Sequence, residues 1–287
     1  MKDLLILLRP HQYVKNLFIF APILFAFNFS QANILSSLYA FVLFSILASS
    51  VYILNDYLDI QEDKKHPTKC KRPLASGSVS LHHAQMMFLF LAATVFILSF
   101  LFSKELFIVL VAYFILNILY SLRLKHIPIV DIFIISTGFV LRLFAGALVT
   151  NTPLSMWIII ITFLLAIFLA LAKRRDDVLL SLEGKETRKS IDGYNLEFVN
   201  AAMVLMSGVV ILSYLQYTVS TAVIARLGSE YLYLTAFFVI LGILRYMQIT
   251  FVESASGSPT KIVLKDRFLQ ITILFWLLSF VGIAKFL

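Results

Sequence analysis

One stretch of the sequence, Asn55–Gly77, combines acidic and basic residues in a spacing that could bind a metal ion and a phosphate ester. Asp56, Asp59 and Asp63 follow one another at i, i+3 and i+7, so on a helix their carboxylates project from one face. Three such charges repel one another unless a cation lies between them, and carboxylates together with substrate phosphates are ligands that suit Mg²⁺. The spacing therefore predicts a Mg²⁺ site, with Asn55 one turn before Asp59 as a supporting ligand.

The second part of this stretch is basic, with five lysine and arginine residues after Asp63. Pro67, Pro73 and Gly77 interrupt it, which favours a shaped turn over a flexible tail. A basic turn beside a metal would hold the rest of an anion, so the two parts together predict a diphosphate site. The alternative is that these charges form only a solvated loop after a membrane helix. The predicted catalytic residues are Asp56, Asp59, Asp63, Lys69 and Arg72.

The composition indicates a polytopic membrane protein. Of the 287 residues 60% are hydrophobic and 14% are charged, whereas a soluble protein has about a quarter of its residues charged. The net charge of +8 does not indicate nucleic-acid binding, because the basic residues are confined to particular loops. The one cysteine, Cys70, excludes an internal disulfide and a thiolate metal cluster. The N-terminal residues lack a small-residue cleavage site, so we expect no removable signal peptide.

Nine apolar runs are long enough to cross a bilayer, which takes about 17 to 25 residues each. No linker separates them, so we expect an all-α bundle that forms a single transmembrane domain over residues 1–287. The expected spans are 14–30, 34–57, 84–102, 106–122, 128–150, 154–173, 198–220, 231–251 and 267–286.

The distribution of positive charge predicts the orientation of these spans. With the N-terminus in the cytoplasm, 20 lysine and arginine residues lie on the cytoplasmic side and three lie on the opposite side. This asymmetry is typical of the positive-inside rule. The candidate site then faces the cytoplasm, where soluble phosphorylated metabolites are found.

Basic and amide side chains near other helix ends are candidates for binding an anionic ligand. Lys15 and Asn16 stand at the entrance to the first expected span, where the alternative is an interfacial segment that meets only lipid phosphates. Arg123 and Lys125 follow the fourth span, where either one alone is better explained as a determinant of topology. The predicted substrate-binding residues near helix ends are Lys15, Asn16, Asn55, Tyr120, Arg123, Lys125, Lys173 and Arg174.

Two ionisable residues, Asp131 and Arg142, lie inside the fifth expected span. Such residues are costly within a membrane and mark functional sites by default. They are eleven residues apart, which places them on one helix face but about 16 Å apart along its axis. They cannot pair directly, so each needs another partner. We therefore expect both to line a polar cavity and to bind substrate.

A second group of acids and bases, Lys173–Asp177, ends the sixth expected span. Two cations on one diphosphate would need a second set of carboxylates opposite the first. Asp176 and Asp177 are the candidates for this second metal position.

At these residues the chain resembles the UbiA superfamily of intramembrane prenyltransferases over essentially its whole length. Asn55–Asp63 is similar to the first aspartate-rich motif of that superfamily, and Arg72–Gly77 is similar to its companion. The resemblance implies a bundle of nine spans, a central cavity open to the cytoplasm, and Mg²⁺ bound to a diphosphate.

Within the superfamily the chain most resembles the decaprenyl-phosphate phosphoribosyltransferases. One departure is that this branch has a glutamate shortly after the Lys-Arg pair, whereas Asp176 and Asp177 follow here, so the identity of the second carboxylate stays open. The resemblance is carried by Arg9-Pro10, Lys15-Asn16, His66–Lys69, Tyr120-Ser121, Leu124-Lys125, Asp131, Gly138–Arg142, Ala145-Gly146, Lys173-Arg174, Arg245-Tyr246 and Asp266-Arg267.

The resemblance implies Mg²⁺-dependent transfer of a 5-phosphoribosyl group from 5-phosphoribosyl 1-diphosphate (PRPP) to a polyprenyl phosphate of the decaprenyl type. Diphosphate would be released, and the product would be a glycolipid precursor for the cell envelope. The protein would lie in the bacterial inner membrane, and a homo-oligomer is left open. The many cations expected on one side also suit a donor that carries phosphate at two ends.

Two alternatives remain at this point. One is a prenyltransferase that moves a prenyl group from a prenyl diphosphate to an aromatic or other small acceptor. The other is a transporter in which Asp131 and Arg142 mark the translocation path. Transporters often contain inverted repeats, but the second half of the chain has no counterpart of Asn55–Gly77.

Overall fold

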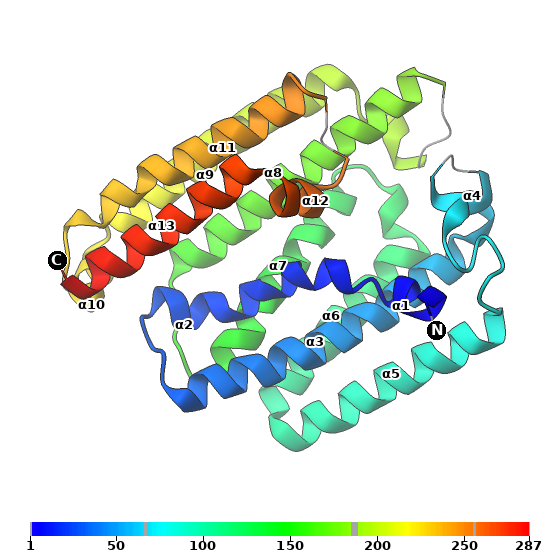
Figure 1. Ribbon diagram of the computed structural model, residues 1–287, viewed down its shortest axis with the longest axis horizontal. Helices are drawn as coiled ribbons and strands as arrows, with labels where there is room; N and C mark the ends of the chain where they lie inside the picture. Colours follow the sequence, from blue (N-terminus) through cyan, green and yellow to red (C-terminus); the bar gives the residue numbers. More distant parts are fainter. Residues whose placement is uncertain (1, 66–67, 185–188, 255–256, 287) are drawn as a thin grey trace.

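The computed structural model describes residues 2–65, 68–184, 189–254 and 257–286, and every regular element in these ranges is a helix (Figure 1). Eight of the described helical segments are long and apolar enough to cross a membrane. They are α3 (Gln31–Leu58), α5 (Leu81–Phe102), α6 (Lys104–Leu122), α7 (Val130–Val149), α8 (Met156–Leu182), α9 (Leu196–Thr218), η5 (Tyr231–Thr235) with α11 (Ala236–Phe251), and α13 (Arg267–Phe286).

The first expected span, 14–30, is not one continuous α-helix. After α1 (Lys2–Leu8) the chain forms a 3₁₀ helix, η1 (Pro10–Phe20), and then a short α-helix, α2 (Ala21–Phe25). Pro22 explains the change, because proline lacks an N–H group and its ring clashes with the carbonyl group four residues earlier. This segment is therefore not among the eight helices of spanning length in the described residues.

Polar side chains fix where five of the long helices begin. The side chain of Ser30 accepts a hydrogen bond from the Asn33 backbone N–H at the start of α3. A serine or asparagine side chain does the same at the starts of α5, α6, α8 and α9. Such N-caps satisfy backbone N–H groups that have no partner within the helix. The remaining four caps are Ser80, Ser103, Ser155 and Asn195.

One end of the bundle carries most of the short elements, and it is the end at which the acidic stretch lies. The elements there are α4 (Ile60–Lys65), η2 (Lys69–Lys71), η3 (Leu124–His126), η4 (Lys189–Gly193) and α12 (Pro259–Lys265), while α10 (Thr221–Leu227) lies at the other end. The helix α8 continues to Leu182, so Lys173–Asp177 is helical rather than the start of a loop.

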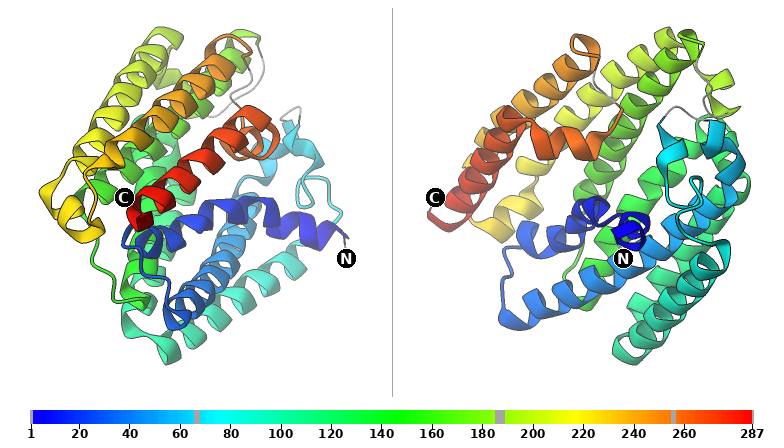
Figure 2. Two further views of the ribbon diagram at one scale, coloured as in Figure 1. Left: turned by 60° about the vertical axis from the view of Figure 1, so that its left-hand side comes forward. Right: turned by 45° about the vertical axis from the view of Figure 1, so that its right-hand side comes forward.

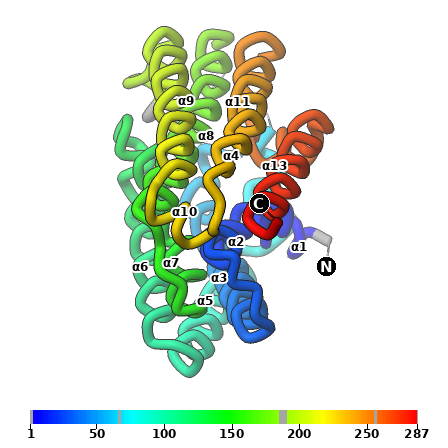
Figure 3. Tube along the Cα trace, turned by 90° about the vertical axis from the view of Figure 1, so that its left-hand side faces the viewer, coloured from blue at the N-terminus to red at the C-terminus, as the bar shows by residue number. Residues whose placement is uncertain are grey.

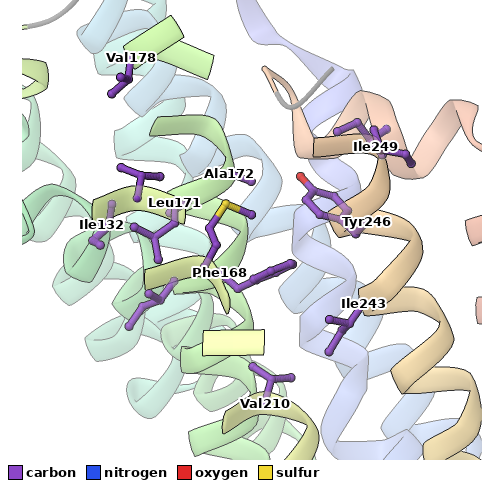
Figure 4. Close-up of a cluster of buried hydrophobic side chains, with 14 of the residues drawn as sticks. Ile132, Phe168, Leu171, Ala172, Val178, Val210, Ile243, Tyr246 and Ile249 are labelled. Carbon is purple, nitrogen blue, oxygen red and sulfur yellow. The ribbon is translucent and has the colours of Figure 1, made fainter. Parts of the chain in front are cut away.

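The spans fall into two groups that meet at α7. In Figures 1 and 2, α3, α5 and α6 lie on one side, and α8, α9, α11 and α13 lie on the other. Three separate clusters of buried apolar side chains each include one residue of α7. These residues are Ile132, Ala145 and Leu143. Figure 4 shows the cluster of the second group, in which Ile132 of α7 lies next to Leu171 of α8, while Phe168 of α8 points towards Tyr246 of α11. The helix α7 is therefore a shared wall between the two groups.

Candidate functional site

The acidic stretch lies at the junction of α3 and α4, where two of its carboxylates contact the same arginine. Nη1 of Arg72 lies 3.0 Å from Oδ1 of Asp56 and 2.6 Å from Oδ2 of Asp63. Nη2 of Arg9 lies 2.5 Å from the same oxygen of Asp56. Both carboxylates are almost completely buried. Asp56 and Asp63, which are seven residues apart, therefore both contact Arg72. This agrees with the prediction that their carboxylates project from one face.

The middle aspartate has a different partner. The helix is interrupted at Asp59, which ends α3 just before α4 begins. Its Oδ1 forms an ion pair with Lys125 of η3, and its Oδ2 accepts a hydrogen bond of 3.1 Å from Nδ2 of Asn55. Asn55 in turn accepts a bond of 3.3 Å from the hydroxyl of Ser121. The structure thus joins the acidic stretch to the end of α6, and among the described residues Asp59 shares no partner with Asp56 or Asp63.

These contacts divide the predicted metal ligands into two groups. Among the described residues no three acidic, histidine or cysteine side chains are gathered as a metal site. Each carboxylate is instead neutralised by an arginine or a lysine of the same chain. The predicted metal ligands nevertheless offer only oxygen atoms. Two of these, Oδ1 of Asp56 and Oδ2 of Asp63, already lie close to the same nitrogen atom, Nη1 of Arg72.

Arg142, the arginine within α7, is held by neutral groups. Its Nε donates to Oδ1 of Asn16 at 2.7 Å, its Nη1 donates to the Gly138 carbonyl oxygen at 2.7 Å, and its Nη2 donates to the Tyr113 hydroxyl at 3.3 Å. The guanidinium also lies 4.7 Å from the ring centre of Phe44. As expected from their spacing, Arg142 and Asp131 have separate partners. Asn16 is buried and positions Arg142, since its amide nitrogen also donates to Ser45.

A second cation, Lys15, lies close to Arg142. Lys15 is half-buried on η1, and its charged neighbours are Arg142 and Arg9. No ion pair between described residues includes Lys15 or Arg142. Buried and half-buried cations without a carboxylate partner favour the binding of an anion at this place, because an unpaired charge in a low dielectric is costly.

The same cationic region extends to the start of η1, where His11 lies. Partial burial lowers the pKa of His11 below its ordinary value of 6.5, and the positive charges of Arg9, Lys261 and Lys15 lower it further. Lys261 belongs to α12, which packs against η1. The protonated form of this imidazole is therefore disfavoured, and an anion bound here would raise its pKa.

The other ionisable residue of α7, Asp131, pairs with α8. Its Oδ2 lies 2.8 Å from Nε of Arg174, and both side chains are completely buried. The Tyr194 hydroxyl donates to Oδ1 of Asp131 at 2.7 Å and accepts the Ile129 N–H at 2.7 Å. Burial and the hydrogen bond to Asp131 raise the pKa of Tyr194. Ile129 has a φ of 68°, which is rare for a β-branched residue, and Tyr194 holds this start of α7 in place.

The predicted second carboxylates lie on the same helix as Arg174. Asp177 forms an ion pair with Arg174, so Arg174 lies between two acids. Asp176 packs closely against Gly257, which lies two residues before α12. A Cβ added at Gly257 would be 2.4 Å from Oδ2 of Asp176. Arg245 on α11 binds Asp266 and Glu253 at 2.7 and 2.8 Å. Hydrogen bonding to Arg245 lowers the pKa of Asp266, which lies between α12 and α13.

The remaining predicted site residues differ in the exposure of their side chains. Lys69, Tyr120 and Lys173 are half-buried, and Arg123 is exposed at the end of α6. His66 and Pro67, which carry part of the resemblance, lie outside the described residues. The structure thus brings Asn55, Asp59, Lys125 and Ser121 together, and separately Asp56, Asp63, Arg72 and Arg9.

Three contributors were not predicted from the sequence, namely Arg9 as a partner of Asp56, Tyr113 as a partner of Arg142, and Tyr194 as a partner of Asp131. Arg9 carries one local signal, because it is basic and directly precedes Pro10. It also adopts the left-handed conformation with φ 53°, which is uncommon for residues other than glycine. The two tyrosines carry no local signal, since they lie 29 and 63 residues from their partners.

Known proteins share both the sequence and the fold. The family model described as the UbiA prenyltransferase family matches residues 17–283. The chain is 31% identical to the decaprenyl-phosphate phosphoribosyltransferase of Mycolicibacterium smegmatis over 94% of this chain and 88% of that protein. It is 32% identical to the protein of the same name from Mycobacterium tuberculosis over 96% and 92%.

A solved structure, a UbiA homologue from Archaeoglobus fulgidus bound to GPP and Mg²⁺, superimposes with a TM-score of 0.72. The two chains are 19% identical, and the match covers 98% of this chain and 99% of the other, so this likeness concerns the fold. The match to the family model and the named relatives identify a transferase and set aside the transporter hypothesis. The protein is a multi-pass membrane protein that belongs to the UbiA prenyltransferase family.

Proposed function

We propose that this protein transfers the 5-phosphoribosyl group of PRPP to a polyprenyl phosphate and releases diphosphate. The observation that carries the proposal is the surplus of cations near the acidic stretch. Arg9, Arg72 and Lys125 each already neutralise a carboxylate, whereas Lys15 and Arg142 have no carboxylate partner among the described residues. PRPP carries phosphate at two ends and the acceptor carries a third, so three anionic groups need cations here. The names of the relatives from M. smegmatis and M. tuberculosis support this choice.

The residues present fit a Mg²⁺ cofactor. Asp56 and Asp63 each direct an oxygen to one atom of Arg72, so one small cation could bind both carboxylates in place of that guanidinium. Asp59 and Asn55 form a separate group of oxygen donors at the end of α3 that a bound ion would have to draw towards Asp56 and Asp63, and Asp176 and Asp177 are the candidates for a second ion. When bound, Mg²⁺ would neutralise the negative charge of the departing diphosphate. The A. fulgidus homologue bound to GPP and Mg²⁺ supports a divalent cofactor.

The cations of the chain would then take over the donor phosphates. Asp56, Asp59 and Asp63 would hold the metal, and Arg72, Arg9 and Lys125, which neutralise these acids here, would then be available to bind the diphosphate together with Lys69. Lys15, beside Arg142, would hold the lipid phosphate, and Arg123 and Lys173 are assigned to the donor's other phosphate, near which Arg174 would act through its pairs with Asp131 and Asp177. Tyr120, Asn16 and Asp131 would position these groups.

The chemical step is a single displacement at C1 of the ribose. The bond from C1 to the diphosphate oxygen breaks, a bond from C1 to an oxygen of the lipid phosphate forms, and the anomeric centre is inverted. The attacking oxygen is ionised near neutral pH, because the second pKa of a phosphate monoester is about 6. No general base is therefore required, and the chain's task is to orient two anions that repel each other.

The wider assignments rest on the same proposal. We infer a single domain over residues 1–287 in which η1 and α2 complete a ninth membrane segment beside the eight spans. The site would open into a central cavity on the cytoplasmic side of a bacterial inner membrane. The product would serve as a glycolipid precursor of the cell envelope.

A label-transfer assay tests this function. Purified protein is incubated with Mg²⁺, PRPP labelled in the ribose, and a polyprenyl phosphate, and the lipid phase is then extracted. We expect label in the lipid phase, and none when a chelator removes the metal. An Arg142→Gln variant should lose about a hundredfold or more in rate, which corresponds to about 2.7 kcal/mol of transition-state stabilisation.

Two controls make the result decisive. The first replaces PRPP with a prenyl diphosphate and the lipid with an aromatic acceptor. If label from PRPP stays in the aqueous phase while the prenyl diphosphate is consumed, the donor assignment is wrong and the protein is a prenyltransferase. The second is Val204→Trp on the outer surface of α9, which should retain the wild-type rate.

A further inference from the structure

Two grooves on the outer surface of the bundle differ in one respect. The first has a volume of about 650 Å³ and lies between α3 and α5, with walls that include Leu38, Val42 and Leu98. The second has a volume of about 710 Å³ and lies between α8, α9 and α11. Its walls are formed by Arg175, Asn200, Ala201, Val204, Leu205 and Phe251. Only the second of these two grooves contains a charged side chain.

Arg175 is 7% exposed and is held by neutral partners. Its Nε donates to Oδ1 of Asn200 at 3.0 Å, and its Nη1 donates to the Thr250 carbonyl oxygen at 2.7 Å. Its guanidinium carbon lies 5.2 Å from the ring centre of Phe251. No ion pair between described residues includes Arg175, whereas the adjacent Arg174 binds two carboxylates. These contacts fix the guanidinium beside the groove. One acid, Asp176, interacts with it electrostatically but forms no ion pair with it, so among the described residues the guanidinium has no directly bonded carboxylate in a mostly apolar groove, which is unfavourable.

The rest of the groove is apolar and faces outwards. Val204 and Leu205 are 54% and 61% exposed on a spanning helix, so acyl chains of the bilayer cover them. The groove lies near the ends of α8 and α11 and the start of α9, which places Arg175 near the level of the lipid head groups. The site therefore combines a cationic end near the membrane interface with an apolar channel that leads into the bilayer.

We propose that this groove binds an anionic phospholipid of the bilayer, with the phosphate of its head group at Arg175 and one acyl chain along Ala201, Val204 and Leu205. The charge of Arg175 selects an anion, and the apolar walls select a lipid over a free phosphate. The acceptor lipid is a different molecule, because the groove is formed by α8, α9 and α11, whereas the acidic stretch contacts Arg9, Arg72 and Lys125. Figure 3 shows α8, α9 and α11 at one edge, and α3 and α5 at the other.

Lipid competition measured by native mass spectrometry tests this proposal. The wild-type protein is mixed in detergent with equal amounts of phosphatidylglycerol and phosphatidylcholine that carry the same acyl chains. We expect about fivefold greater retention of phosphatidylglycerol, the ratio that corresponds to about 1 kcal/mol. Equal retention of the two lipids by the wild type would overturn the proposal, whatever the variants do.

Matched tryptophan variants locate the lipid. Val204→Trp fills the charged groove, and Val42→Trp fills the apolar groove at a valine that is exposed to a similar extent, 45% against 54%. We expect Val204→Trp to abolish the preference for phosphatidylglycerol and Val42→Trp to retain it. Arg175→Gln should also abolish it, provided that circular dichroism shows a folded protein. If both tryptophan variants behave alike, or if a polyprenyl phosphate displaces phosphatidylglycerol one for one, the groove is not a phospholipid site.

Discussion

Lys125 and Asp59 illustrate how the residues of this site are coupled. The two side chains form an ion pair and are 6% and 10% exposed, so neither is well solvated if the other is removed. Breaking a buried pair leaves one uncompensated charge, which typically costs about 3–5 kcal/mol. Asp59 therefore has two separable properties, its contribution to the folded state and its proposed contribution to metal binding.

We expect Asp59→Asn to lower the free energy of unfolding by about 3–5 kcal/mol and to reduce the transfer rate at least a thousandfold, which corresponds to about 4 kcal/mol. Unfolding in detergent and the label-transfer assay would measure the two effects.

The double variant Asp59→Asn, Lys125→Met separates them. It removes both charges, so most of the lost stability should return while the activity stays low, because the proposed metal ligand Asp59 and the proposed diphosphate contact of Lys125 are both missing. Recovery of activity together with stability would mean that Asp59 serves only to neutralise Lys125.

Local spacing was sufficient to predict part of this site. The i, i+7 spacing of Asp56 and Asp63 places them on one face, and they share Arg72 nine residues further on. The interval between Asp131 and Arg142 likewise indicated that they have separate partners. The pairing of Asp59 with Lys125 spans 66 residues, and it depends on how α6 packs against α3. No local pattern in one sequence contains that information.

At the scale of elements, apolar runs predicted most helices because the membrane requires them. The predictions were less accurate where polar residues extend a helix or proline interrupts one. The helix α8 continues through Lys173–Asp177 because Arg174 and Arg175 are buried against α7, α9 and α11. Pro22 divides the first expected span into η1 and α2.

The close contact between η1 and α7 gives a prediction about Gly146. A Cβ added at this glycine would lie 1.9 Å from the Ile19 backbone oxygen, so any side chain would force the two elements apart. We expect Gly146→Ala to lower the free energy of unfolding by about 1–3 kcal/mol and to reduce activity, because Asn16 on η1 holds Arg142 on α7. Thermal unfolding and the transfer assay would measure this.

Gly208 on α9 is the matched control, since a Cβ added there meets no atom within 4 Å. Gly208→Ala should leave activity unchanged and stabilise the helix by up to about 1 kcal/mol, because alanine has the higher helix propensity. Equal behaviour of the two variants would contradict close packing at Gly146.

At the scale of the whole molecule, the charge distribution predicts the orientation in the membrane. With 20 basic residues expected on one side and three on the other, the end that carries the acidic stretch should face the cytoplasm. All four ion pairs of that stretch, and the pairs of Arg174 and Arg245, lie near the ends of helices on this side.

Thiol labelling tests this orientation. A membrane-impermeant maleimide should label the single cysteine, Cys70, only after the inner membrane is opened. Because Cys70 is half-buried, a second variant is needed. Lys104→Cys in a Cys70→Ser background places an exposed thiol on the opposite side, where intact spheroplasts should label it. The reverse pattern would invert the proposed topology.

The position of α7 between the two groups of helices has a consequence for biosynthesis. Chains leave the ribosome N-terminus first, and every ion pair of the acidic stretch joins residues between Arg9 and Lys125. The apolar cluster of the first group is also complete at Ala145. This half can therefore assemble while α8 is still being translated. Asp131 on α7 is different, because its cation, Arg174, arrives only with α8. An acid without a counter-ion is poorly tolerated in lipid, so α7 and α8 should enter the bilayer together as a helical hairpin.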